Sequence, residues 1–412
     1  MALRRTVVKN YPVVAYIDPT LFCNLRCPAC PTGLRLGLRP AASIKWDMYR
    51  SIIDEIGDYL FVLNMFNWGE PLLHKQTPEL IRYAKAKGIE VTLSTNLSLN
   101  LTDAYIERLV RSGLDTLTVS VDGATEETYK RYRRGGDYSL VRTNMLRIQS
   151  ARARLRLDTP KIVWQFLVFR HNQHEIDVVR AQYEAWGADL LLIAGAHMPF
   201  EPYDEGFEPS SIPEYNLYDP GHPYQILGRR QLAGGRPCSW LYGGFALNPN
   251  GKVSPCCACA AEKDDFGEYS PCRGFFDVWN SYRFKKARRL FLERGRGRGN
   301  QALGDLEPTR IAQRLAGTGG ELQAPLKPGE LICQKCPVPF VRDGVNATIA
   351  LIAQRHASLL LAKRDIRYLL ALLLMGGPAA GPILRGAVRK INRTVRLPLH
   401  RLFARTRLQQ RV

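Results

Sequence analysis

The chain has 412 residues, with 58 Lys or Arg against 38 Asp or Glu and a net charge of +20. This length is ample for one large core and an appended domain. The amino terminus, MALRRTVVKNYP, passes from a short basic stretch into an apolar run without a signal peptide. Ten cysteines in grouped spacings without an export signal argue against a disulfide framework and predict a cytoplasmic protein.

The first predicted strand, PVVAYI, is followed at once by three cysteines, Cys23, Cys27 and Cys30, in the spacing C-x3-C-x2-C. Three thiolates from one short loop leave the fourth iron of a cubane iron–sulfur cluster without a protein ligand and open to a small molecule. The alternative is zinc, but structural zinc takes four protein ligands that usually arrive in pairs. The spacing therefore favours a cluster.

Five further apolar runs follow in chain order, each ending in a short polar or glycine-containing motif and each followed by a helix-like stretch. They are FVLNMF, EVTL, TLTV, KIVWQFLVF and DLLLIAG. Continuous apolar runs that alternate with helical patterns predict a parallel sheet covered by helices. In such α/β barrels the functional site lies at the carboxyl ends of the strands, where these motifs stand.

The cysteine loop and these motifs together resemble the core of radical S-adenosylmethionine (radical SAM) enzymes. The resemblance covers about residues 11–200 and implies a partial (β/α)6 TIM-like barrel. It further implies that Cys23, Cys27 and Cys30 hold a [4Fe-4S] cluster whose open iron is chelated by the amino and carboxylate groups of SAM.

The same resemblance assigns SAM contacts to seven further positions. Trp68-Gly69-Glu70-Pro71 stands where the family has GGEP, so Gly69 and Glu70 meet the SAM amino group. Four side chains fall where relatives line the ribose and methionine parts of SAM, and an arginine resembles one that meets the SAM carboxylate. These are Ser94, Asn96, Ser120 and Asp122, and Arg133.

Two positions depart from the family pattern, and two have a simpler interpretation. Trp68 replaces the first glycine of GGEP, and Ala29 stands where many members carry an aromatic residue that packs on adenine. Taken singly, Asp122 reads equally well as a helix-capping residue and Glu70 as a solvated carboxylate.

Seven more cysteines lie beyond the barrel. The segment that carries them resembles the SPASM extension of radical SAM enzymes. In order, it contains a cysteine, a hairpin turning at Asn250-Gly251, a cysteine at the strand end, a helix and a closing C-x2-C. The resemblance implies one auxiliary [4Fe-4S] cluster, with Cys257 able to replace Cys256. A four-thiolate zinc site is the alternative, and Cys259 and Cys272 are unassigned, either plain buried thiols or hydrogen-atom donors. The expected ligands are Cys238, Cys256, Cys333 and Cys336.

We accordingly expect a linker at 201–235, a SPASM-like domain at 236–340 with a flexible insertion near 292–330, and a basic helical tail at 341–412. The tail holds fourteen Lys or Arg against Asp343 and Asp365. From Pro382 to Leu397 it predicts a basic amphipathic helix, suited to an anionic membrane surface or an acidic partner. The alternative is that its apolar stripe packs on the barrel. The tail has few aromatic residues for base stacking, so nucleic acid is not expected.

The resemblance implies an oxidoreductase-like enzyme that cleaves SAM reductively and abstracts a hydrogen atom from its substrate, with an electron donor such as flavodoxin or ferredoxin. No catalytic acid or base can be assigned, although His171, His174 and Glu175 follow the fifth strand. The chain begins almost at the first strand, without room for a small peptide-recognition domain. We therefore expect a sugar, glycan or lipid-linked small molecule as substrate. The alternatives are a SPASM-type peptide maturase and a non-catalytic metal- or SAM-binding scaffold.

Overall fold

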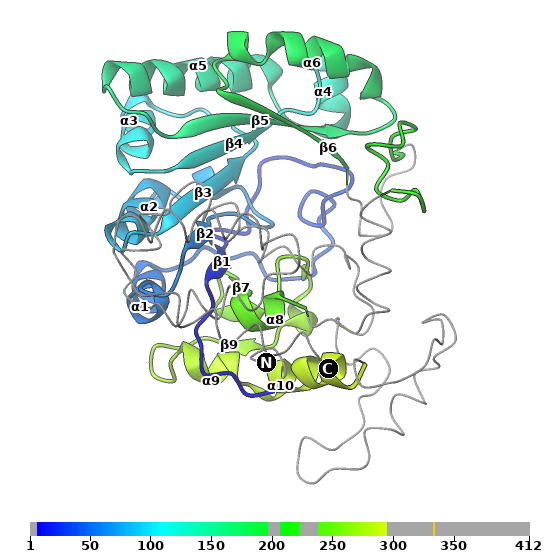
Figure 1. The fold of residues 1–412 in the computed structure, drawn as a ribbon. Helices are drawn as coiled ribbons and strands as arrows, with labels where there is room; N and C mark the ends of the chain where they lie inside the picture. Colours follow the sequence, from blue (N-terminus) through cyan, green and yellow to red (C-terminus); the bar gives the residue numbers. More distant parts are fainter. Residues whose placement is uncertain (1–5, 197–206, 223–237, 295–332, 334–412) are drawn as a thin grey trace, which may run out of the picture. The chain divides into compact units, whose positions relative to one another are not determined.

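The computed structural model describes residues 6–196, 207–222, 238–294 and 333, all of which belong to one compact unit, Arg4–Asp343 (Figure 1). The predicted tail at 341–412 lies outside the described residues. Parts of the predicted linker at 201–235 and nearly all of the predicted insertion near 292–330 also lie outside them.

Six parallel strands form the centre of the described fold, as the sequence predicted. Each strand pairs in parallel with the next one along the chain. Strands β1 and β2 bury nearly every residue, whereas β3 and β5 alternate buried with less buried residues. With the helices between them they make the partial (β/α)6 barrel. The strands are β1 (Val14–Ile17), β2 (Val62–Asn64), β3 (Glu90–Thr95), β4 (Thr116–Ser120), β5 (Lys161–Val168) and β6 (Leu190–Gly195).

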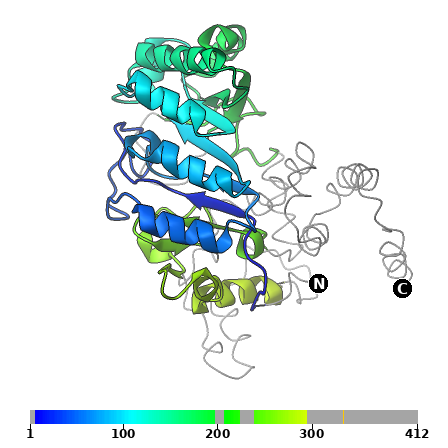
Figure 2. The same ribbon diagram turned by 90° about the vertical axis from the view of Figure 1, so that its left-hand side faces the viewer.

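The connecting helices lie on one face of this sheet, and Figure 2 shows them stacked in front of the strands. The first helix buries Tyr49, Ile52, Ile53 and Ile56, the spacing of a single apolar stripe. Side-chain caps fix where other helices begin: Asp137, for example, accepts a hydrogen bond from the Leu140 amide at 2.8 Å. The helices are α1 (Trp46–Ile56), α2 (Thr77–Ala86), α3 (Asp103–Arg111), α4 (Glu126–Tyr132), α5 (Tyr138–Arg154) and α6 (Ile176–Gln182).

The segment after residue 238 continues the same sheet instead of starting a separate one. Strand β7 (Gly244–Leu247) pairs in parallel with β1, and β8 (Lys252–Ser254) and β9 (Gly267–Glu268) then add antiparallel strands. The predicted turn between β7 and β8 is present, with Gly251 at φ +86°, a conformation that favours glycine. Together with the barrel strands this gives the order β6-β5-β4-β3-β2-β1-β7-β8-β9 among the described residues.

Three helices complete this second part: α8 (Trp240–Gly243), α9 (Phe275–Trp279) and α10 (Tyr282–Arg294). Arg288 in α10 is fully buried, and its guanidinium donates to the carbonyl oxygens of Leu241 (2.7 Å) and Trp279 (2.8 Å). It lies 4.8 Å from the centre of the Trp279 ring, and burial lowers the pKa of Arg288 to about 9. One buried cation thus joins all three helices.

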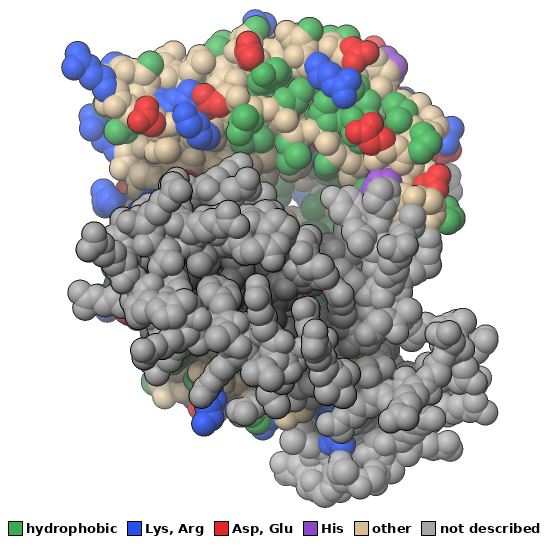
Figure 3. Space-filling view, in the orientation of Figure 1, with side chains coloured by type: hydrophobic (Ala, Val, Ile, Leu, Met, Phe, Trp, Pro, Cys, Tyr) green, Lys and Arg blue, Asp and Glu red, His purple; other side chains and the backbone are tan. Residues whose placement is uncertain are grey.

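Acidic and basic side chains are interspersed on the surface over α5 and α6 (Figure 3). None of the described helices combines the length and apolar character that a bilayer crossing demands.

Candidate active site and auxiliary metal centre

The three cysteines of the first loop lie directly beyond the carboxyl end of β1. This loop extends to the side of the sheet opposite α1, α2 and α3 (Figure 1). Cys27 is buried, whereas Cys23 and Cys30 are partly buried, and the Cys30 amide donates to the Cys27 carbonyl oxygen at 3.2 Å. Apolar side chains from distant parts of the barrel pack around the loop, including Tyr132 and Phe169.

Nitrogen donors converge on two of these sulfur atoms. The Leu25 amide lies 3.4 Å from Cys23 Sγ, and Asn96 Nδ2 approaches the same sulfur at 3.9 Å. Arg133 Nη1 lies 3.9 Å from Cys27 Sγ. Burial raises the pKa of Cys23 to about 12 and that of Cys27 to about 11. Thiols in such a setting become thiolates when a metal compensates their charge, and N–H groups aimed at the sulfurs are what a cluster needs around it. The donor set therefore fits an iron–sulfur cluster.

The loop after β2 carries the predicted Gly69 and Glu70 and packs tightly on the segment that leads to Cys23. A Cβ atom at Gly69 would lie 1.7 Å from the Thr20 carbonyl oxygen, so only glycine fits there. The Glu70 amide donates to the Phe22 carbonyl oxygen at 2.8 Å. These backbone contacts hold the loop against the segment that leads to the cysteines.

The Glu70 carboxylate is buried and turned into the protein instead of solvated. Oε1 accepts from Thr95 Oγ1 (2.6 Å) and from the Leu72 amide (3.0 Å), and Oε2 accepts from the Asn96 amide (2.8 Å). Burial raises the pKa of Glu70 above its usual value, and these hydrogen bonds offset only part of that rise. Since the Asn96 side chain also approaches Cys23 Sγ, one residue contacts both Glu70 and the cysteine loop.

Asp122 and Arg133 form a buried ion pair at the carboxyl end of β4. Arg133 Nε lies 2.5 Å from Asp122 Oδ2, and Asp122 Oδ1 accepts from the Leu167 amide at 2.7 Å. Asp122 is therefore not a simple helix cap. Its carboxylate holds the guanidinium that approaches Cys27.

The two predicted serines lie on neighbouring strands. Ser94 is half-buried within β3, and Ser120 is buried at the end of β4. Hydrogen bonds that would join them to Glu70 or to Arg133 are not seen in the described part of the chain. The structure thus brings Glu70, Asn96, Asp122 and Arg133 to the cysteine loop and leaves the serines on the adjacent strands.

Aromatic rings lie beside the cysteine loop even though Ala29 is not aromatic. Phe169 follows β5, and its ring centre lies 4.4 Å from that of Tyr132 and 5.4 Å from that of His171. Burial lowers the pKa of His171 to about 4, so the imidazole is neutral at physiological pH. His174 is exposed. Glu175 accepts from the Ala124 amide at 2.8 Å, so it supports the loop after β4.

Asp18, the residue directly after β1, was not predicted as a site residue. It is 1% exposed, and its Oδ2 accepts from the amides of Trp68 (2.8 Å) and Gly69 (3.1 Å). Oδ1 has no hydrogen-bond partner among the described residues. Burial raises the pKa of Asp18 to about 7. A lone aspartate after a strand gives no sequence signal for this role, because its partners are 50 residues away.

The second group of cysteines gathers around the loop 256–259. Cys256 Sγ lies 4.0 Å from Cys259 Sγ. Burial is the largest cause that raises the pKa of Cys257, and the neighbouring Cys256 and Cys238 raise it further. The hydrogen bond with Cys256 is the largest cause that raises the pKa of Cys259, followed by burial, Cys256 and Cys333. Pairwise interactions therefore link five thiols into one group: Cys238, Cys256, Cys257, Cys259 and Cys333.

Cys272 and Cys336 are the remaining cysteines of the second group. Cys272 is exposed, and Cys336 lies outside the described residues. Within the described ranges, no three His, Cys, Asp or Glu side chains are close enough to hold a single metal ion.

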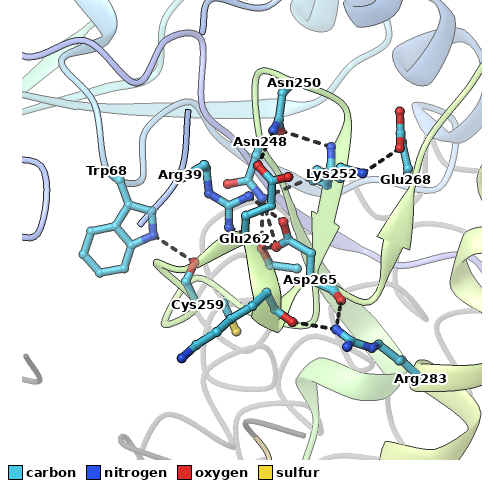
Figure 4. A network of polar contacts seen from close by, with 12 residues as sticks. Arg39, Trp68, Asn248, Asn250, Lys252, Cys259, Glu262, Asp265, Glu268 and Arg283 are labelled. Atoms are coloured by element: carbon cyan, nitrogen blue, oxygen red, sulfur yellow. Dashed lines mark hydrogen bonds and ion pairs between the residues drawn. The ribbon is translucent and has the colours of Figure 1, made fainter. Parts of the chain in front are cut away.

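A buried ion pair connects this loop region to the segment after the first cysteines (Figure 4). Arg39 lies 2.5 Å from Asp265, and both side chains are only 4% exposed. Asp265 also accepts from Ser254 Oγ at 2.5 Å, and the Glu262 amide donates to the Leu38 carbonyl oxygen at 2.9 Å. Charged side chains this deeply buried are seldom left unpaired, so the two cysteine-bearing segments are fixed to each other here.

Family comparisons agree with both parts of this geometry. The profile of the radical SAM superfamily matches residues 17–159, and that of the SPASM iron–sulfur cluster-binding domain matches residues 238–302. The chain is a radical SAM enzyme. Its radical SAM domain carries a [4Fe-4S] cluster with SAM, and its SPASM domain binds an auxiliary iron–sulfur cluster.

Curated relatives of this radical SAM enzyme match it over different spans. An AdoMet-dependent heme synthase of Methanosarcina barkeri is 34% identical over 124 residues, which is 30% of this chain and 35% of the relative. A PqqA peptide cyclase of Granulibacter bethesdensis is 26% identical over 298 residues, covering 65% of this chain and 74% of the relative.

Solved structures show the same fold. SuiB of Streptococcus suis superposes with a TM-score of 0.50 at 14% identity and covers 66% of each chain. The structure of anSMEcpe with bound AdoMet also gives a TM-score of 0.50, at 15% identity, and covers 83% of this chain and all of the other.

Proposed function

We propose that this radical SAM enzyme binds SAM at a cluster held by Cys23, Cys27 and Cys30 and uses it to abstract a hydrogen atom from carbon. The observation that carries the proposal is the convergence of Asn96 and Arg133 on two of these thiols, from the motifs after β3 and β4.

Glu70 and Gly69 are proposed to receive the SAM amino group. A carboxylate has about four acceptor sites, and three at Glu70 are taken by Thr95, Leu72 and Asn96. One site, on Oε2, is left for an ammonium group. The three protein donors fix the carboxylate, so little rotational freedom is lost when the amino group binds.

Arg133 is proposed to face the SAM carboxylate, with Asp122 holding the guanidinium in place. Asp122 contacts Nε and Nη1 faces Cys27 Sγ, which leaves Arg133 Nη2 for an anion among the described residues. Asn96 orients the Cys23 side of the loop, and Ser94 and Ser120 are proposed to line the ribose and methionine parts from β3 and β4. Tyr132, Phe169 and Phe207 supply apolar surface beside the loop in place of an aromatic at Ala29, and they keep water from it.

When bound, the cluster supplies the electron that cleaves SAM to methionine and a 5′-deoxyadenosyl radical, which takes a hydrogen atom from the substrate. Cys238, Cys256, Cys333 and Cys336 are proposed to hold the auxiliary cluster, and a small reductant such as flavodoxin or ferredoxin to supply the electron.

The substrate class is open between the two that the sequence suggested. A sugar, glycan or lipid-linked small molecule stays a prediction. A peptide is favoured by a separate observation: the similarity to the PqqA peptide cyclase covers 65% of this chain and 74% of the relative. We therefore propose peptide modification as the second candidate function.

The test is anaerobic cleavage of SAM. Wild type with filled clusters, a strong reductant and SAM should yield 5′-deoxyadenosine by mass spectrometry, and Cys27→Ala should yield none. Deuterium carried from labelled candidate glycans or peptides into 5′-deoxyadenosine then identifies the substrate class. Equal product from Cys27→Ala and wild type would refute the proposal.

A further inference from the structure

The departure at Trp68 has a structural explanation that the SAM site alone does not provide. The loop 67–70 is fixed on its inner side, because Asp18 accepts hydrogen bonds from the Trp68 and Gly69 amides and Gly69 abuts Thr20. On this inner side the loop contributes only its backbone amides and the lack of a side chain at Gly69. Nothing in it requires a large side chain at 68.

The outer side of the loop contacts the auxiliary cysteine segment. Trp68 Nε1 donates to the Cys259 carbonyl oxygen at 3.2 Å, across 191 positions of sequence (Figure 4). With its amide oriented so that both ends find partners, Asn67 donates to the Cys257 carbonyl oxygen at 3.1 Å and accepts from Trp68 Nε1 at 3.0 Å. The indole N–H therefore has two acceptors, the Cys259 carbonyl oxygen and the Asn67 side-chain oxygen.

The carbonyl groups that Trp68 and Asn67 hold belong to the loop whose thiols form the auxiliary site. Cys259 is fully buried, and its sulfur lies 4.0 Å from that of Cys256. A metal bound by cysteines of this loop fixes its backbone, because metal ligation orders the segment that carries the ligands. A change in the backbone at 257–259 reaches the indole directly.

We propose that Trp68 is a positioning residue that couples the auxiliary site to SAM binding. Filling the auxiliary site sets the 257–259 backbone, the indole N–H transmits that geometry to the loop 67–70, and Gly69 and Glu70 are thereby held for the SAM amino group. The inference rests on the proposed function of Gly69 and Glu70. Coupling of this kind is reciprocal, so SAM should also affect the auxiliary site.

A double-mutant cycle tests the coupling. The dissociation constant of SAM is measured by anaerobic equilibrium dialysis on reconstituted full-length protein for wild type, Trp68→Phe, Cys333→Ala/Cys336→Ala and the combined variant. Phenylalanine keeps an aromatic ring at position 68 and removes the indole N–H. Loss of the auxiliary cluster should weaken SAM binding about five-fold or more in the wild-type background and less than about two-fold in the Trp68→Phe background.

The matched control is Trp46→Phe, because Trp46 lies in α1 and stacks edge-on with Tyr83. In that background the loss should equal the wild-type loss. Equal weakening in the Trp68→Phe and wild-type backgrounds, or no weakening in wild type, would overturn the inference.

A second readout keeps the test independent of the dialysis. SAM should perturb the electron paramagnetic resonance (EPR) signal of the auxiliary cluster in wild type and not in Trp68→Phe or Trp68→Gly. Persistence of that perturbation in both variants would contradict the coupling. Failure of wild type to bind SAM with its first cluster filled would instead refute the proposed function, so the two failures are distinct.

Discussion

Arg133 Nε lies 2.5 Å from Asp122 Oδ2, while another nitrogen of the same guanidinium lies 3.9 Å from Cys27 Sγ. The Asp122 side chain is fully buried, and that of Arg133 is 13% exposed. One buried carboxylate thus holds a cation against a cysteine 106 positions away, and the stability and the chemistry of the site depend on the same pair.

Arg133→Met should destabilise the protein by about 3–5 kcal/mol, because it leaves Asp122 buried without its counter-charge. Asp122→Asn should restore part of that loss when combined with Arg133→Met, since a neutral amide needs no cation. Urea unfolding of the anaerobic protein measures both. The control is Arg131→Met, an exposed position in α4, which ends directly before Arg133; it should change the free energy of unfolding by less than about 0.5 kcal/mol. An Arg133→Met protein as stable as the control would contradict the buried pair.

Asp18 should make the protein less stable as pH rises. Burial raises the pKa of Asp18 from 3.8 to about 7, so the folded state holds a proton that the unfolded chain has released between those pH values. The stability that this proton contributes is therefore fully present below pH 3.8 and is lost as pH rises to about 7, with about 2–3 kcal/mol lost between pH 5 and 8. Asp18→Asn should flatten this dependence, and Asp47→Asn, at an exposed position, should not. An unchanged slope in Asp18→Asn would show that this carboxyl does not titrate as described.

Cys333→Ala/Cys336→Ala should remove about four irons per chain, the content of one cubane cluster. Cys272→Ala should remove none, because Cys272 is exposed and is not among the proposed ligands. Iron and zinc are measured by elemental analysis after anaerobic purification. Loss of zinc in place of iron would support the alternative four-thiolate site.

Deletion of residues 382–412 should release the protein from anionic liposomes, because the predicted basic amphipathic helix lies in this segment. Co-sedimentation with vesicles of anionic and of neutral lipid measures the effect. Substituting Arg385 and Arg389 with glutamine, which keeps the apolar positions, should weaken binding to the anionic vesicles alone. Full-length and truncated chains that sediment equally would sink the membrane proposal.

The six barrel strands and the first cysteine loop could be predicted because their signals are local. Apolar runs such as KIVWQFLVF and the spacing of Cys23, Cys27 and Cys30 depend only on nearby residues. The Asn250-Gly251 turn is local for the same reason, since Gly251 needs a positive φ.

What the sequence did not predict depends on pairs that are far apart in the chain. Asp18 meets Trp68, Arg39 meets Asp265, and β7 pairs with β1, across gaps of 50 to more than 200 residues. Trp68 departs from the glycine of the family pattern, and the contact that explains the tryptophan is with the Cys259 carbonyl oxygen, 191 positions away. Neither partner of such a pair carries a spacing or periodicity that points to the other.

The most direct test of the account is the EPR spectrum of the reduced protein with and without SAM, recorded on Cys333→Ala/Cys336→Ala so that one cluster remains. The account predicts a single [4Fe-4S] signal whose g-values shift when SAM is added, and no such signal in a variant that also carries Cys27→Ala. A signal that SAM leaves unchanged at saturating concentration, from a protein with four irons per chain, would contradict binding of SAM at the Cys23, Cys27 and Cys30 cluster.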